Sequence, residues 1–450
     1  MRAKYITNAC FLFEFSDGMT ILSDPWLSDG IYHGLIFNYP PIGPELKSGY
    51  LELRPDYIYI SHLHSDHLDA MTLKHFDKKT PIIVGKFSTP AMFLSLKSLG
   101  FENIIEIEFG VTTLLGQHEV RIYSQFSGSS DDLINDSGVD VDTSIFLQDV
   151  DGQKCFFAVD NPMQERHADM IRKEHGVVDL AILPYTGASV YPFIYKNYSP
   201  EEKRKRMLAL RKAKLDKFVQ LSKTIMARRI VPAAGSFVLG GKGACHAPFQ
   251  PQPTPRQITE HWQSSGMDAD QLCMLSTGDS VELGALKVEL EPLTKGVDRD
   301  YSEEDRVAYA ASIAQFSCDL DLVQWPAALR LPWKSLLNRA RKNMWAYQNK
   351  SVCKPESDVY LIIKSSAQVP FPQEEEMRVK IAMDNEKLDF PLSSYSTDRP
   401  YTEFYFSANV LLALMLGATY WNVAEYHMQS YRNPDKFDPT IRSLLTFFKL

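Results

Sequence analysis

Residues 61–69, SHLHSDHLD, place three histidines and two aspartates within nine positions of a 450-residue chain that has only 11 histidines. The preceding run, YIYI (57–60), is rich in β-branched and aromatic residues and predicts a strand that ends at this stretch. In open α/β layers, ligands gather where strands end. Imidazole and carboxylate groups are the usual protein ligands of zinc and iron. The stretch therefore predicts a metal site at a strand end.

The spacing within this stretch predicts two metal ions rather than one. His62 and His64 point to the same side of an extended segment, so both can bind one ion. Asp66 and His67 follow at a bend and suit a second ion nearby, with Asp66 also expected to act in catalysis. The alternative is a helix N-terminus capped by Asp66 or Asp69. Capping explains one aspartate but not three histidines, so the metal interpretation is preferred.

Composition limits the classes of function that remain. A net charge of −8 argues against nucleic-acid binding and against an anionic membrane surface. The apolar stretch 409–424 is too short and too interrupted to span a bilayer, and the N-terminus reads as a strand rather than a signal peptide. Six scattered cysteines without a CxxC pair suit reduced thiols. We therefore expect a cytoplasmic enzyme that acts on a small molecule; homo-oligomer formation stays open.

The order of strand-like and helix-like runs predicts two units. Residues 1–295 alternate between them and predict a layered α/β domain, and residues 296–450 predict a smaller α+β extension. Residues 201–229 predict a long helix with a face crowded by Lys and Arg, which we interpret as solvated rather than as a wall near an anionic substrate. The Gly- and Pro-rich passage 235–255 lacks the phosphate-binding lysine pattern and is interpreted as an irregular loop.

The motif HxHxDH at 62–67 resembles the metal-binding motif of the metallo-β-lactamase fold, which implies an αββα sandwich. NACFLFEFSDGMTILSDPWL (8–27) and FFAVDN (156–161) resemble other parts of that fold in the expected order. The wider run resembles the branch that contains CMP-N-acetylneuraminate hydroxylase. It includes DPWLSDGIYHG, LPYTGASVYPF, VPAAGSFV and, near the C-terminus, DVYLIIK and YTEFYFSANVLLALMLG.

This resemblance implies a set of site residues. The implied metal ligands are His62 and His64 on the first ion, Asp66 and His67 on the second, Asp160 between them, and His246 as a late histidine on the second ion. Asp24 is expected to act through a hydrogen bond rather than as a ligand. Tyr185, in the aromatic-rich loop, is expected to line the substrate pocket and to take part in catalysis.

One departure from the hydrolases of this fold concerns the third histidine of the first metal. Residues 127–146, SGSSDDLINDSGVDVDTSIF, contain no histidine, and His118 is interpreted as a surface residue. The resemblance puts Asp140 at the ligand position and makes Asp142 structural, although the choice among Asp136, Asp140 and Asp142 stays open. A carboxylate stabilises oxidised iron better than neutral imidazole does. The pattern therefore favours two iron ions over zinc or manganese.

Two functions follow from this reasoning. The preferred one is a non-haem diiron oxygenase that hydroxylates an unidentified metabolite. Its electrons would come from an external donor, because no Cys–His pairs suitable for a Rieske cluster are present. The alternative is a zinc- or manganese-dependent hydrolase of a phosphodiester, lactone or ester. The C-terminal extension weakly resembles the sterol-carrier fold, but a cap over the site or a dimer contact is preferred.

Overall fold

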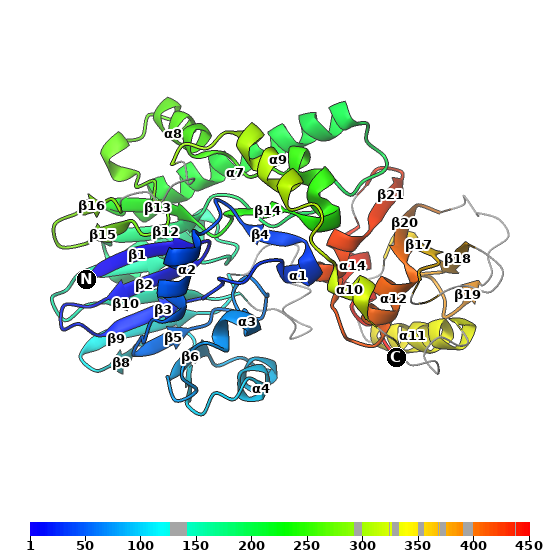
Figure 1. Cartoon of the computed structure of the whole chain (residues 1–450), viewed down its shortest axis with the longest axis horizontal. Helices are drawn as coiled ribbons and strands as arrows, with labels where there is room; N and C mark the ends of the chain where they lie inside the picture. Colours follow the sequence, from blue (N-terminus) through cyan, green and yellow to red (C-terminus); the bar gives the residue numbers. More distant parts are fainter. Residues whose placement is uncertain are drawn as a thin grey trace.

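The computed structural model describes residues 1–126, 142–291, 299–323, 325, 333–349, 355–367, 369, 375–389, 399–436 and 438–450. Two sheets form the centre of the N-terminal part (Figure 1). The larger has the order β16-β15-β1-β2-β3-β5-β6-β7 and the smaller the order β13-β12-β11-β10-β9-β8. The strands of the larger sheet are β1 (Arg2–Thr7), β2 (Cys10–Glu14), β3 (Thr20–Ser23), β5 (Tyr57–Tyr59), β6 (Ile82–Gly85), β7 (Ile104–Ile107), β15 (Ser280–Glu282) and β16 (Lys287–Glu289).

The smaller sheet consists of β8 (Thr113–Leu115), β9 (His118–Tyr123), β10 (Ser144–Gln148), β11 (Lys154–Phe157), β12 (Leu180–Pro184) and β13 (Arg229–Ala233). The two sheets meet through aromatic side chains. Phe11 and Phe13 of β2 alternate with a partly exposed residue, and the Phe11 ring meets the Phe157 ring edge-on, with centroids 5.3 Å apart. Each such ring contributes about 1.5–3 kcal/mol by leaving water. The core between the sheets therefore holds the domain together.

Helices cover the outer faces of both sheets. On the larger sheet lie α2 (Pro44–Leu51), α3 (Ala70–Leu73) and α4 (Ala91–Ser98), whose apolar side chains share a core with β5 and β6. On the smaller sheet lie α6 (Glu165–His175), α7 (Pro200–Ile225) and α8 (Pro255–Ser264). The predicted αββα sandwich is confirmed. Among the described helices, none combines the length and hydropathy that a bilayer crossing requires.

Helix α7 confirms the long helix predicted at 201–229. Ser199 caps its start, because the hydroxyl accepts a hydrogen bond from the Glu202 amide at 3.2 Å, and Pro200 occupies the first turn. The helix ends at Met226, which has a positive φ of 54°. Phe218 and Ile225 are buried in the core beneath the helix, whereas most of its basic residues face away from that core.

A short ribbon and several short helices join this domain to the rest of the chain. The ribbon pairs β4 (Ile36–Asn38) with β14 (Phe237–Leu239). Beside it lie α1 (Ile31–Gly34), η1 (Gly241–Phe249) and α9 (Glu303–Ser312), and η2 (Ala269–Gln271) follows α8. Ala310 of α9 shares a small core with Phe37 and Val238 of the ribbon. Part of the chain beyond residue 295 thus packs on the first domain, and the boundary near 295 stays a prediction.

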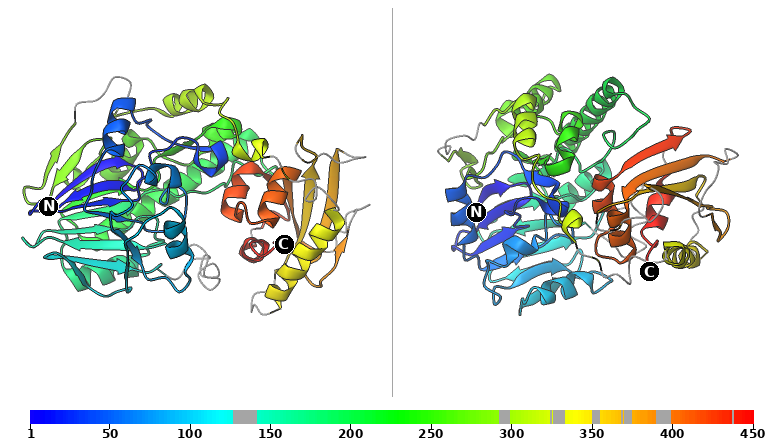
Figure 2. Two further views of the ribbon diagram at one scale, coloured as in Figure 1. Left: turned by 60° about the horizontal axis from the view of Figure 1, so that its bottom comes forward. Right: turned by 45° about the vertical axis from the view of Figure 1, so that its right-hand side comes forward.

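The C-terminal part forms a second α/β unit with its own core. Its sheet has the order β19-β18-β17-β20-β21, in which β17 and β20 are parallel and the other pairs are antiparallel. The strands are β17 (Asp358–Lys364), β18 (Glu376–Ile381), β19 (Leu388–Asp389), β20 (Tyr401–Ser407) and β21 (Gln429–Asn433). The helices are α10 (Asp319–Leu322), α11 (Trp333–Gln348), α12 (Ala408–Met415), α13 (Trp421–Ala424), η4 (Glu425–His427) and α14 (Pro439–Leu445). The predicted smaller C-terminal unit is confirmed (Figure 2).

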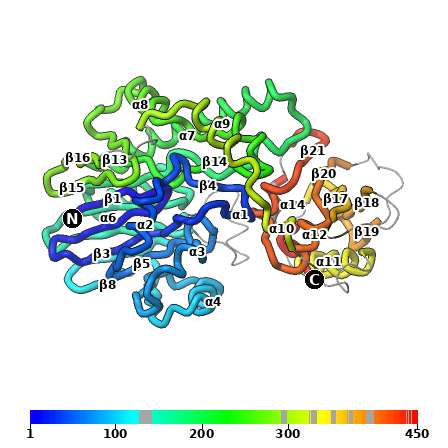
Figure 3. The backbone as a smooth tube through the Cα atoms, viewed as in Figure 1, coloured from blue at the N-terminus to red at the C-terminus, as the bar shows by residue number. Residues whose placement is uncertain are grey.

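The two units meet at α1, which lies beside residues 419–427 of the C-terminal unit (Figure 3). His427 Nε2 lies 3.0 Å from the carbonyl oxygen of Tyr32, and His33 Nε2 lies 3.2 Å from the Thr419 hydroxyl. Gly34 has a φ of 86° and packs against the backbone of Ser317, which leaves no space for a Cβ atom. This close approach brings the C-terminal unit next to residues 61–69.

Candidate metal centre

The SHLHSDHLD stretch forms the buried loop between β5 and α3. His62 and His67 are fully buried, and Asp66 is nearly so. The loop ends where the Asp69 carboxylate accepts a hydrogen bond from the Met71 amide at 3.0 Å and thereby caps α3. The helix-cap alternative is thus correct for Asp69. It leaves the three histidines and Asp66 without a capping role.

A first group of candidate ligands joins this loop to the start of β10. His62 Nε2 lies 2.8 Å from His64 Nδ1 and 3.6 Å from Asp142 Oδ1. The donor atoms of these three residues all lie within 4.8 Å of one another. Thr143 holds the start of β10 against the histidine loop, because its hydroxyl donates a hydrogen bond to the Ser61 carbonyl at 2.9 Å. Asp142, which we had interpreted as structural, therefore belongs to this group.

The other two aspartates considered for this position, Asp136 and Asp140, lie outside the described residues. The assignment of Asp140 as a ligand therefore stays a prediction. Asp142 is held in place independently of them, since its amide donates to the Gln125 side chain at 3.3 Å.

A second group shares His62 with the first and adds His67 and Asp160. His67 Nε2 lies 3.3 Å from Asp160 Oδ2 and 3.4 Å from Asp66 Oδ2. This nitrogen is buried and has no hydrogen-bond partner among the described residues. A ring nitrogen left without a hydrogen bond and facing two carboxylates fits a bound cation. The nitrogen and oxygen donors of both groups suit iron or zinc.

Asp24 and Ser61 orient the two buried imidazoles from behind. The Asp24 carboxylate accepts hydrogen bonds from His67 Nδ1 at 2.8 Å and from the Ser61 hydroxyl at 2.6 Å. The Ser61 oxygen can then accept from His62 Nδ1, 2.9 Å away. In their neutral forms both rings would thereby carry the proton on Nδ1 and direct the Nε2 lone pair toward a metal. These hydrogen bonds fit the indirect role expected for Asp24, which stays a prediction.

The C-terminal unit contacts the remaining histidine of the motif. The Asn422 amide of α13 lies 3.3 Å from His64 Nε2, and the Tyr420 ring stacks on the His64 ring with centroids 6.3 Å apart. On the opposite side, the Tyr32 hydroxyl donates to Asp66 at 3.1 Å. His64 and Asp66 are thus positioned by segments that lie far from them in the sequence.

Burial and charge keep His62 and Asp66 in the ionisation states that metal binding requires, whereas the nearby carboxylates favour a protonated His67, which would release a proton on binding a metal. Burial, reinforced by the charges of His67 and His64, lowers the pKa of His62 well below its usual value. Burial alone would raise the pKa of Asp66, but the nearby His67 charge outweighs it and the pKa is about 2. Likewise, burial opposes protonation of His67, yet Asp66, Asp160 and Asp24 together raise its pKa. A neutral His62 beside ionised carboxylates is a ligand set ready for a cation.

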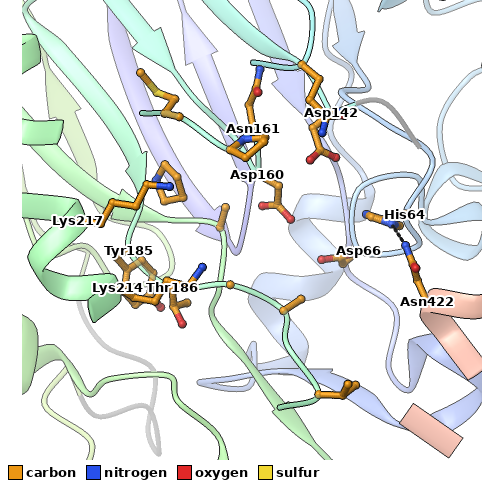
Figure 4. Close-up of a pocket in the computed structure, with 18 of the residues that line it drawn as sticks. His64, Asp66, Asp142, Asp160, Asn161, Tyr185, Thr186, Lys214, Lys217 and Asn422 are labelled. Atoms are coloured by element: carbon orange, nitrogen blue, oxygen red, sulfur yellow. Dashed lines mark hydrogen bonds between the residues drawn. The ribbon is translucent and has the colours of Figure 1, made fainter. Parts of the chain in front are cut away.

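The candidate ligands open into a cavity of about 260 Å³ (Figure 4). One side is lined by His64, Asp66, Asp142 and Asp160, and the other by Tyr185, Thr186, Lys214 and Lys217. The C-terminal unit completes the lining with Asn422, Glu425 and Tyr426. Tyr185 thus lines the cavity, as the sequence analysis predicts. Burial raises the pKa of its phenol, so the hydroxyl stays protonated at neutral pH.

Two histidines differ from their expected positions. The structure does not bring His246 into either ligand group: it lies in η1, where its ring stacks on Phe193 with centroids 5.2 Å apart. Burial, followed by the charge of Lys203, lowers its pKa to about 4. The prediction that His118 is a surface residue is wrong, because His118 is fully buried between Asp17 and Asp149.

Several residues of the cavity were missed by the sequence analysis. Lys214 and Lys217 belong to the basic face of α7 that was interpreted as solvated, and Asn422 carries no motif. The crowding of Lys and Arg on α7 is the sequence feature that could have indicated the two lysines. No feature of the sequence around Asn422 indicates that it lies at the cavity.

Residues 2–207 match the family described as the beta-lactamase superfamily domain. The chain is similar to a protein of Mycobacterium tuberculosis named as a Rieske 2Fe-2S iron-sulfur protein, with 30% identity over 52% of this chain and 44% of that protein. It is also similar to the cytidine monophosphate-N-acetylneuraminic acid hydroxylase of Xenopus laevis, with 24% identity over 97% of this chain and 70% of the relative. The chain thus spans less than half the length of the first of these relatives.

Solved structures with a similar fold include a hydrolase and a hydroxylase. One is an isothiocyanate hydrolase from Delia radicum gut bacteria, with a TM-score of 0.45 and 17% identity over 63% of this chain and 98% of that one. The other is CmlA, a diiron beta-hydroxylase from Streptomyces venezuelae, with a TM-score of 0.42 and 17% identity over 62% of this chain and 53% of that one.

Proposed function

We propose that the N-terminal domain holds two iron ions and hydroxylates a small molecule. This domain has the metallo-β-lactamase fold. The observation that carries the proposal is the position of Asp142. It forms a group with His62 and His64, and the resemblance to hydrolases of this fold implies a third histidine on that metal. An anionic oxygen ligand favours oxidised iron over zinc. The similarity to a hydroxylase along nearly the whole chain supports the same assignment.

The proposed ligand set draws on the two groups in the structure and adds Asp66, whose carboxylate lies 3.4 Å from His67 Nε2. His62, His64 and Asp142 would hold the first ion, His67 and Asp66 the second, and Asp160 would lie between them. Two iron ions bound there would supply the activation of dioxygen that hydroxylation of a carbon centre requires. His246 is left out of this set, because it belongs to neither ligand group and its ring stacks on Phe193.

The protein's own side chains have separate tasks in this proposal. Asp24 and Ser61 hold the imidazoles in one tautomer. The ionised Asp66 is the candidate for accepting a proton at the centre, and it is oriented by the Tyr32 hydroxyl. The protonated Tyr185 phenol, 3.4 Å from the Ser236 hydroxyl, would position the substrate by hydrogen bonding.

The C-terminal unit is proposed to cap the cavity. The Asn422 amide can turn its oxygen toward His64 Nε2 and accept the proton there, which leaves Nδ1 for the metal. The contributions of Glu425 and Tyr426 to the lining exclude water from that side. A sterol-carrier-like role of the C-terminal unit stays a prediction, and the proposed cap does not depend on it.

The electrons are proposed to come from a separate donor. The 450 residues contain no C-x-H or C-x-x-H pair of the kind that ligates a Rieske cluster. Similarity to a protein named for such a cluster supports a donor of the iron–sulfur type.

Metal analysis tests this proposal directly. Protein expressed in medium that contains both iron and zinc is expected to hold about two irons per chain, with ligand-to-iron charge-transfer absorption. Two zincs or manganeses and a featureless spectrum would overturn it. The alternative, a hydrolase of a phosphodiester, lactone or ester, would then take its place.

The variant Asp142→His sharpens the test, because it restores the three-histidine pattern. We expect its iron-to-zinc ratio to fall severalfold relative to the wild type. Asp17→His, a change to an exposed carboxylate outside both ligand groups, is the matched control and should leave the ratio unchanged. An unchanged ratio in Asp142→His would remove the argument from Asp142.

A further inference from the structure

Helix α7 presents two lysines to the cavity on the side opposite the aspartates. Lys214 and Lys217 are one helical turn apart, and Figure 4 shows them across the cavity from Asp66 and Asp160. Lys214 reaches the turn that follows β12, where a Cβ atom on Gly187 would lie 3.3 Å from its Nζ. The absence of a side chain at Gly187 lets the ammonium group approach the backbone of this turn.

Both lysines line the cavity, whereas Lys212 on the same helix does not. The Lys212 ammonium group lies 2.7 Å from Asp216, one turn further on. Desolvation, together with the repulsion of Lys214, lowers the pKa of Lys217. Two positive charges that face one cavity repel each other, and an anion between them would relieve that repulsion.

A buried hydroxyl provides an independent sign of a ligand at the same place. Thr186, next to Gly187, is only 7% exposed and lines the cavity. Its Oγ1 has no hydrogen-bond partner among the described residues. Buried polar atoms nearly always have a partner, so an unpartnered hydroxyl on a cavity wall indicates a ligand that completes it. The site also lies at the C-terminal end of a strand, the usual place for ligands in α/β sheets.

The number of charges indicates the class of anion. A phosphoryl group carries a charge between −1.5 and −2 near neutral pH, whereas a carboxylate carries −1. Lysine binds phosphate as a point charge, and a hydroxyl can donate to a further phosphate oxygen. We propose that Lys214, Lys217 and Thr186 form a phosphate subsite that anchors a phosphorylated substrate. The second half of this inference, that the anchored molecule reacts at the opposite wall, rests on the proposed function.

Binding of inorganic phosphate, measured by titration calorimetry at constant ionic strength, tests the subsite. Wild-type protein should bind phosphate both after chelator treatment and with metal present. The double variant Lys214→Gln/Lys217→Gln should bind at least about tenfold more weakly, and Thr186→Val should weaken binding by a smaller factor. Lys212→Gln is the matched control on the same helix and should bind like the wild type. Lys214→Arg/Lys217→Arg, which keeps both charges, should retain most of the affinity.

Several results would overturn the phosphate subsite. These are no phosphate binding by the wild type, equal affinity in the double lysine variant with an unchanged melting temperature, or acetate binding as tightly as phosphate. The last would replace phosphate by a carboxylate. Binding only to metal-loaded protein, unaffected by the lysines, would place phosphate on the metals instead. The measurement on metal-free protein does not depend on iron. The diiron proposal can therefore fail while the phosphate subsite is supported, and the phosphate subsite can fail while the diiron proposal is supported.

Discussion

At one end of the cavity His62 and His67 are fully buried and hydrogen bonds from behind fix their rings, whereas at the other end Lys214 and Lys217 extend on long side chains from a helix surface. A metal needs ligands held within a few tenths of an ångström, which only short, packed side chains can provide. Flexible ammonium groups can adjust their positions to a charged substrate group. Substitutions at the metal end should therefore cause large losses of metal binding, whereas substitutions at the lysine end should weaken anion binding more gradually.

The largest effect is expected for His64→Ala. The variant removes a ligand of the first group, so it should lose at least one metal per chain and all detectable activity, while its circular dichroism remains that of the wild type. His75→Ala, an exposed histidine on the same segment, is the control and should keep both metals. Full metal content in His64→Ala would show that this end of the cavity is not a metal centre.

Asp24→Asn should have the next largest effect. The carboxylate holds His67 and Ser61 without being a proposed ligand, so its loss should weaken metal binding by about 10- to 100-fold. Competition with a chromophoric chelator measures this affinity. Wild-type affinity in the variant would mean that the two rings are held by packing alone.

Asn422→Ala should weaken metal binding by about tenfold or less, since it removes one hydrogen-bond partner of a single ligand. The control is Asn343→Ala. The Asn343 amide donates a hydrogen bond to the Lys449 carbonyl at 2.8 Å, and Asn343 does not line the cavity. Equal chelator competition in both variants would leave the C-terminal unit as a cover without a positioning role.

The smallest effect is expected for Asp69→Ala, within the same nine-residue stretch. Loss of the cap on α3 should lower the free energy of unfolding by about 1 kcal/mol, with metal content unchanged. Chemical denaturation and elemental analysis of the same sample measure both quantities. Loss of metal in this variant would mean that capping and metal binding in the loop cannot be separated.

Much of the metal end could be predicted because its residues are close in the chain. His62, His64, Asp66 and His67 lie within six positions, and a strand followed by a bend directs their side chains to one place. The αββα sandwich and the helix at 201–229 were likewise accessible, because hydrophobic periodicity and a motif specific to the fold are local properties of the sequence.

The remaining positions depended on tertiary structure. The histidine motif meets Asp142 through the contact of β10 with the loop at Ser61, and it meets Asn422 through the packing of the C-terminal unit on α1. In η1 the His246 ring stacks on Phe193, and His246 belongs to neither ligand group. The sequence by itself determined which residues could bind a metal, because ligand chemistry and short-range spacing are written in it. Only the folded chain decided which distant side chains complete the site, because strand pairing and the packing of one unit on another set those distances.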